Sequence, residues 1–86
     1  MQVSLEISMY PLDQDYIPPI QSFIDELNTY PEIKVKTNSM STQVFGEYDH
    51  IMEAIKTSIL NAFGANNKVA MVMKLINADL DYEYGE

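Results

Sequence analysis

Eighty-six residues without a single cysteine suffice for one small domain and offer no disulfide and no thiolate metal site. The net charge of −8 and the absence of arginine argue against nucleic acid as a partner, because five scattered lysines make no basic stripe for a phosphate backbone. No window approaches the roughly 20 apolar residues of a membrane helix, and the N-terminus lacks a signal-peptide pattern. We therefore expect a cytoplasmic protein without membrane insertion.

Residues 3–10 alternate between apolar and mostly polar side chains, which predicts a half-buried strand that Pro11 ends. A helix is expected next, with Asp13 and Asp15 as N-capping residues, Pro18–Pro19 in its first turn and Pro31 as its stop. Its inward face is predicted to hold the apolar residues that recur at helical spacing, namely Ile17, Ile20, Phe23, Ile24, Leu27 and Tyr30.

Residues 33–37 and 42–46 alternate in the same way, and the turn-forming residues 38–41 join them into a hairpin. The face that each residue of the second of these strands takes is open by one position. A second helix is predicted for roughly residues 48–63, followed by Gly64 as its C′ residue and by a largely apolar strand over residues 69–76. The expected inward residues of this helix are Ile51, Met52, Ile55, Ile59, Ala62 and Phe63.

The predicted order is βαββαβ, and its economical packing is two helices on one face of a four-stranded antiparallel sheet. The expected fold class is therefore α+β, a ferredoxin-like sandwich. We expect this domain to span residues 1–78, and residues 79–86 to form an acidic, frayed tail.

Catalysis is not expected, although the fold itself hosts many functions. The single histidine, His50, stands beside Asp49 at a helix start, where a surface position is the simplest interpretation, and no paired nucleophile and general base can be found. Because the sequence has one histidine and no cysteine, we expect no metal site. We also expect no cofactor.

The face of the sheet away from the helices has an unusual composition. It is too apolar for a solvent face and too polar for a dry core, and an 86-residue chain gains burial by oligomerising, so two such sheets are expected to pack face to face. Niches between them would suit a flat polar ring, although simple dimer burial without a ligand is an equally open interpretation. The residues expected on this face are Ser4, Glu6, Ser8, Tyr10, Gln43, Phe45, Ala70, Val72 and Ile76.

Four short motifs, in one unbroken register, resemble the YkoF-like thiamine/hydroxymethylpyrimidine-binding domains. They are Ser8-Met9-Tyr10-Pro11-Leu12, the hairpin Lys36-Thr37-Asn38-Ser39-Met40-Ser41-Thr42, the helix start Gly46-Glu47-Tyr48-Asp49-His50-Ile51-Met52, and a Val-x-Met final strand. The resemblance implies a non-enzymatic protein that binds thiamine or its hydroxymethylpyrimidine (HMP) half. It also implies a homodimer or homotetramer and a vitamin-uptake transporter as a partner.

An aminopyrimidine needs both hydrogen-bond donors and acceptors at fixed positions, and the expected ligand-binding residues supply them. These residues are Glu6, Ser8, Tyr10, Asn38, Met40, Ser41 and Thr42. Glu6 would accept from the ring amine or, if buried, pair with Lys36, while Tyr10 would stack and Met40 would form an apolar wall. Two alternatives stay open: the polar residues of the hairpin serve only its turn, or the domain is an ACT-like regulatory or protein-interaction module.

Overall fold

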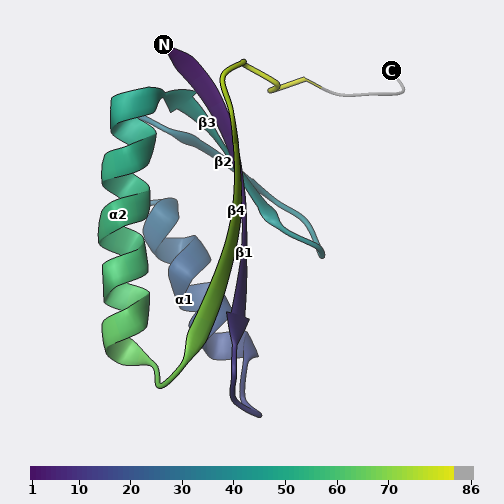
Figure 1. The fold of residues 1–86 in the computed structure, drawn as a ribbon, viewed down its shortest axis with the longest axis vertical. Coiled ribbons are helices and arrows are strands. Elements are labelled where there is room, and N and C mark those ends of the chain that lie inside the picture. Colours follow the sequence, from purple (N-terminus) through teal and green to yellow (C-terminus); the bar gives the residue numbers. More distant parts are fainter. Residues whose placement is uncertain (83–86) are drawn as a thin grey trace.

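Two helices and four strands follow one another in the predicted βαββαβ order in the computed structural model, which describes residues 1–82 (Figure 1). The sheet is antiparallel with the strand order β2-β3-β1-β4, so the ferredoxin-like α+β fold is confirmed. None of the helices within this part of the chain is long and apolar enough to cross a membrane. The elements are β1 Gln2–Pro11, α1 Ile17–Leu27, β2 Lys34–Thr37, β3 Thr42–Glu47, α2 Tyr48–Ala65 and β4 Val69–Ile76.

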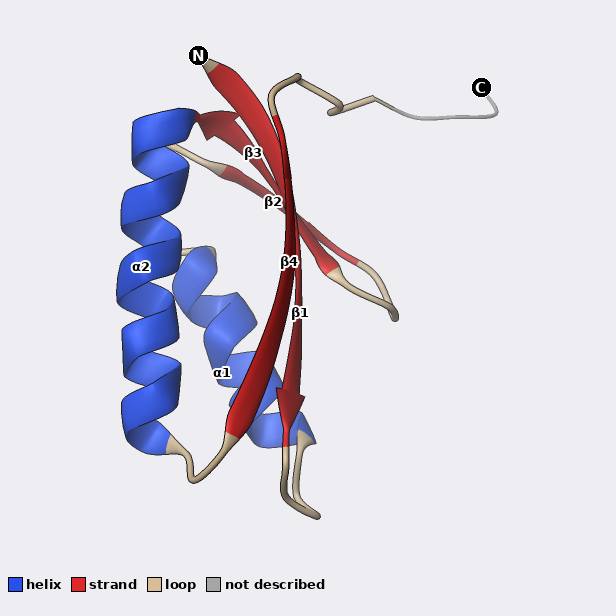
Figure 2. Ribbon diagram, in the orientation of Figure 1, coloured by secondary structure: helices blue, strands red, loops and turns tan. Residues whose placement is uncertain are grey.

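Both helices cover one face of the sheet, and the alternation of β1 decides which residues lie beneath them (Figure 2). The apolar set of β1 packs with Phe23 and Leu27 of α1 and with Ile51 and Ile55 of α2 into one core. Because successive side chains of a strand point to opposite faces, the polar set of β1 lies on the open face without helices. The buried residues of β1 under the helices are Val3, Leu5, Ile7 and Met9.

The start of α1 differs from the predicted one. Its N-cap residue is Tyr16, which makes no side-chain capping bond, and Asp13 instead accepts a hydrogen bond from the Gln14 N–H. The prediction of an aspartate cap was wrong because the helix begins at Ile17, so Tyr16 and not Asp15 occupies the N-cap position. For the same reason Ile17 is 64% exposed rather than inward, while Phe23 and Leu27 are buried as expected.

Helix α2 is longer than predicted and continues through Gly64 to Ala65. Of its expected inward residues, Met52 and Phe63 are exposed, because the buried stripe follows Ile51, Ala54 and Ile55 towards the centre of the sheet. Strand β4 lies at the sheet edge, so the flank of α2 has little sheet beneath it there.

The residues that follow β4 turn across the open face of the sheet instead of fraying. The Ser4 hydroxyl donates to the Ala78 carbonyl oxygen over 2.7 Å and accepts from the Leu80 N–H over 2.8 Å. Asp81 then forms ion pairs with Lys34 at 2.8 Å and Lys36 at 2.7 Å. We call residues 78–82 the C-terminal strap; the remainder of the expected tail, residues 83–86, lies outside the described residues.

The C-terminal strap changes the character of the open face at one end of the sheet. Phe45 lies opposite Ser4 in the ladder and has the Lys36 ammonium 5.6 Å from its ring centre, and it is only 8% exposed. The hydrogen bonds from Lys34 and then Lys36 hold the pKa of Asp81 below its usual value. Part of the face that was expected to need a second protomer is therefore covered by the chain itself.

Candidate functional site

The opposite end of the sheet is open, because two neighbours of β1 have different lengths. Strand β3 pairs with β1 from Gln2 to Ile7, whereas β4 continues alongside β1 as far as Pro11. Beyond Ile7 the β2–β3 hairpin has turned away, so a notch opens between the end of β1, the hairpin turn and α1. The notch holds a cavity of about 430 Å³, within the range typical of small-molecule sites.

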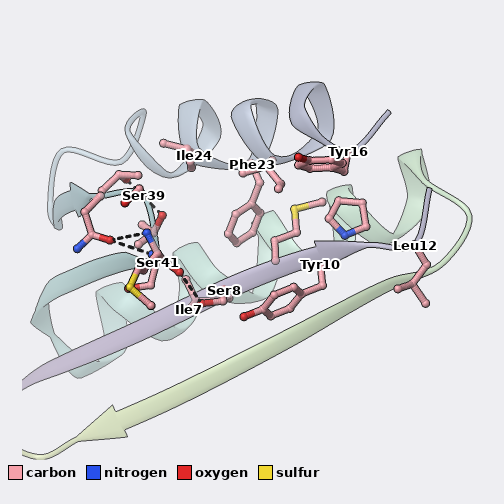
Figure 3. A pocket seen from close by; sticks show the side chains of 16 residues that line it. Ile7, Ser8, Tyr10, Leu12, Tyr16, Phe23, Ile24, Ser39 and Ser41 are labelled. Atoms are coloured by element: carbon pink, nitrogen blue, oxygen red, sulfur yellow. Dashed lines mark hydrogen bonds between the residues drawn. The ribbon is translucent and has the colours of Figure 1, made fainter. Parts of the chain in front are cut away.

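Three elements contribute the walls of this cavity, as Figure 3 shows. Helix α1 supplies an aromatic and aliphatic side, the end of β1 supplies the floor, and the hairpin supplies most of the hydroxyls. None of the lining residues carries a charged side chain. They are Ile7, Ser8, Met9, Tyr10, Pro11, Leu12, Tyr16, Ile20, Phe23, Ile24, Thr37, Asn38, Ser39, Met40, Ser41 and Thr42.

Asn38 fixes the shape of the hairpin turn. Its side-chain carbonyl oxygen accepts hydrogen bonds from the main-chain N–H groups of Met40 at 2.8 Å and Ser41 at 3.0 Å. The main-chain N–H of Asn38 donates to the Ser41 carbonyl oxygen at 3.1 Å. This is the local bonding that favours asparagine in turns. The carbonyl oxygen expected to meet a ligand is thus used by the backbone of the turn.

The hydroxyls of the cavity lie at two depths. Thr42 is 5% exposed on the helix side of the sheet, and its hydroxyl is 3.2 Å from that of Thr37. The Ser8 hydroxyl lies nearer the open face and donates to the Met40 carbonyl oxygen over 3.4 Å. Thr42 and Val44 therefore lie on the side of the sheet that the helices cover. The sequence alone had left open which residues of β3 take this side.

Glu6 is the one predicted site residue that does not line the cavity. Its carboxylate accepts a hydrogen bond from the Ser41 hydroxyl at 3.0 Å and pairs with the Lys74 ammonium at 3.5 Å. The partner expected for it, Lys36, is engaged with Asp81 instead. Glu6 therefore stands behind the cavity wall and positions Ser41.

The other six predicted residues all line the same cavity, with Tyr10 and Met40 at its exposed rim. Sequence reasoning missed the wall formed by α1 and the hydroxyl of Thr37. The α1 residues carried only the signal of a helix face that packs in a core, and Thr37 looked like the last residue of an alternating strand. The missed lining residues with the largest side chains are Tyr16 and Phe23.

The site has no feature of a metal centre. Within residues 1–82, no group of three or more histidine, aspartate or glutamate side chains could hold a metal ion. The two groups with a clearly lowered pKa, Glu47 and Asp81, do not line the cavity, and each owes its shift first to a hydrogen bond with a cationic amine. The chemistry available in the cavity is therefore stacking, apolar contact and neutral hydrogen bonding.

The profile of the YKOF-related family matches residues 2–78, and the chain belongs to this family. A Bacillus subtilis protein named as a candidate HMP/thiamine-binding protein, YkoF, is 31% identical over 64 residues, which cover 74% of this chain. The match spans 32% of that protein's length, so the chain corresponds to about a third of this relative.

Solved structures share the fold over almost the whole chain. A protein of Methanocaldococcus jannascii, MJ1052, superposes with a TM-score of 0.78 at 26% identity, covering 95% of this chain and 84% of its own. A Thermotoga maritima protein, TM0486, described as a candidate thiamine biosynthesis/salvage protein, gives a TM-score of 0.82 at 18% identity, covering 91% and 85% of the two chains. This second likeness concerns the fold alone.

Proposed function

We propose that this chain is a non-enzymatic binding protein for thiamine or its HMP half, with the pyrimidine ring held in the cavity between β1, α1 and the hairpin. The observation that carries the proposal is an uncharged cavity of about 430 Å³, with aromatic side chains on one side and hydroxyls on the other. Membership of the YKOF-related family and the name of the B. subtilis relative support the choice of ligand.

In the proposed complex, the flat ring packs against Phe23 and Tyr16, and hydroxyls meet its edge. Thr37, Thr42 and Ser8 can each donate or accept, which suits a ring with both acceptor nitrogens and an amine. Tyr10 and Met40 at the rim would cover the outer part of the ligand. The lining contains no histidine, carboxylate, lysine or cysteine side chain, in keeping with binding without turnover.

Calorimetric titration with thiamine, HMP and the isolated thiazole half tests the proposal. Thiamine and HMP should bind saturably, and their presence at 100 times Kd should stabilise the fold by about 2.7 kcal/mol through mass action. The thiazole half alone should bind far more weakly, because the proposed contacts are made to the pyrimidine. Flat titrations with both pyrimidine-containing ligands would exclude the proposed function.

A pair of isosteric variants locates the site. Thr42→Val removes a hydroxyl from the cavity, whereas Thr57→Val removes one from the half-buried flank of α2, outside the cavity. Loss of one ligand hydrogen bond should weaken HMP binding by roughly 3–10-fold in the first variant and leave it unchanged in the second. Equal affinities in the two variants would place the ligand elsewhere.

The proposal also includes a homodimer or homotetramer in the cytoplasm, with a vitamin-uptake transporter as a partner. An oligomer is supported by apolar side chains near the cavity that are left bare in the protomer, with Tyr10 53% and Val72 59% exposed. Sedimentation equilibrium measures the first part, and a molecular mass that stays at one protomer at micromolar concentration would contradict it. Co-purification with the membrane component of a thiamine transporter tests the second.

A further inference from the structure

The direction of each main-chain group of β1 follows from two hydrogen bonds at its ends. The Leu12 N–H donates to the Lys68 carbonyl oxygen over 2.9 Å, on the β4 side, and the Tyr48 N–H donates to the Met1 carbonyl oxygen over 2.9 Å, on the β3 side. In an antiparallel ladder the main-chain groups of successive residues alternate between the two neighbouring strands. The even residues of β1 therefore face β4, and the odd residues face β3.

Ile7 is the last odd residue of β1 with a partner, because it pairs with Thr42. The next odd residue is Met9, whose N–H and carbonyl oxygen point towards the side from which the hairpin has withdrawn. Met9 lines the cavity and is 8% exposed, and its main-chain N–H and carbonyl have no partner among residues 1–82. The next odd residue is Pro11, which has no N–H. Proline is typical of strand positions whose N–H has no partner strand, so its place here agrees with an unpaired edge.

A buried main-chain donor and acceptor without partners cost free energy until a ligand or water satisfies them. We propose that the main chain of Met9 reads the pyrimidine: its N–H donates to a ring nitrogen, and its carbonyl oxygen accepts from the neighbouring exocyclic amine. The two bonds replace the pair of main-chain hydrogen bonds that Met9 would have made with a longer β3. This inference rests on the proposed function and adds the group that orients the ring.

The pair at Met9 supplies something that the side chains of the cavity lack. Hydroxyls rotate and serve as donors or acceptors in turn, and the carbonyl oxygen of Asn38 is held by the turn. A main-chain N–H and C=O on a strand have fixed directions, so they accept one arrangement of donor and acceptor on the ring. The site should therefore select rings with an amine next to a ring nitrogen.

Amide signals of ¹⁵N-labelled protein test the inference during titration with HMP. The Met9 amide should shift downfield and exchange more slowly with solvent when HMP is bound. The Ser8 and Tyr10 amides provide internal controls, because they point to β4 and are already paired with Val72 and Ala70. Saturable HMP binding with an unchanged Met9 amide would overturn the inference and leave the proposed function standing, whereas absence of binding would remove both.

Two variants separate the Met9 N–H from the Met9 side chain. Met9→Pro and Met9→Ala both lose core volume, but only Met9→Pro removes the N–H, and it breaks no bond of the ladder because that N–H is unpaired. HMP should bind about 10-fold more weakly to Met9→Pro than to Met9→Ala. Equal affinities would contradict the inference.

A ligand analogue gives the same answer on the unaltered protein and decides the question if Met9→Pro fails to fold. In 5-hydroxymethyl-2-methylpyrimidine a hydrogen replaces the amine, so the Met9 carbonyl oxygen loses its donor. We expect this analogue to bind about 10-fold more weakly than HMP. Full affinity for the analogue would exclude a role for the Met9 carbonyl.

Discussion

The two ends of β1 meet different surroundings. From Ser4 to Ile7, β1 has a neighbour on each side, and the C-terminal strap crosses the open face above Ser4. The terminal amine of Met1 is paired with Glu47, and it lowers the pKa of that carboxyl. At the Met9 end, β3 has already turned away and the main chain faces an uncharged cavity.

This difference shows where a small domain can place a binding site. The chain uses its charges and its C-terminal strap to close one end of the sheet, so Ser4, Lys34 and Lys36 have internal partners there. At the other end, pairing with β4 and the turn at Asn38 hold the backbone in place, yet the main-chain N–H and carbonyl of Met9 remain without partners among residues 1–82. Fixed and unsatisfied groups are what a ligand can recognise.

Among the variants that test this comparison, Phe45→Ala is expected to change stability most. Phe45 lies at the end of the sheet that the C-terminal strap covers. The ring is buried beneath Lys36, and its removal should lower the free energy of unfolding by about 3 kcal/mol. Urea denaturation measures this loss. HMP affinity, corrected for the fraction folded, should not change, and a matching loss of affinity would show that the two ends are not independent.

Ser4→Ala should have the next largest effect. The variant leaves the Ala78 carbonyl oxygen and the Leu80 N–H without their shared hydroxyl, which should cost about 1–2 kcal/mol of stability. Hydrogen exchange at Leu80 should become faster at the same time. Ser22→Ala on the exposed side of α1 is the control, and an equal effect there would argue that the hydroxyl of Ser4 does not hold the C-terminal strap.

Asn38→Ala addresses the open end. The turn loses two hydrogen bonds to an exposed side chain, so stability should fall by only about 1 kcal/mol, while HMP binding should weaken because Met40 and Ser41 lose their fixed positions. Calorimetry and urea denaturation on the same variant compare the two losses. Unchanged binding would mean that the conformation of the turn does not shape the site.

The smallest effect is expected from Asp81→Asn, because the ion pairs of Asp81 lie at the surface. The native pKa of Asp81 is lowered, so its stabilising contribution is complete above the ordinary carboxyl pKa and is lost as the pH falls through the lowered native value. Acid should therefore lower the protection factor of the Leu80 amide, the ratio of its intrinsic to its observed exchange rate, in the unaltered protein. The variant should show the lowered protection factor already at neutral pH, and a pH profile of protection identical to that of the unaltered protein would contradict this.

Local periodicity determined the fold of this protein. The alternation of Val3, Leu5, Ile7 and Met9 and the helical spacing around Phe23 specify strand and helix without reference to distant residues, so the order βαββαβ follows from the sequence. Six of the seven predicted site residues share one cavity for a similar reason, since they lie on one strand end and on one hairpin turn that the fold brings together.

Only the tertiary structure decided which charged side chains pair with one another and which main-chain groups stay unpaired. Whether Glu6 meets Lys36 or Lys74 depends on the register of three strands, and the capture of Lys36 by Asp81 depends on a strap 45 residues further along the chain. The free main chain of Met9 likewise follows from where β3 stops pairing with β1. Such contacts join residues distant in sequence, and no local pattern encodes the twist and register that bring them together.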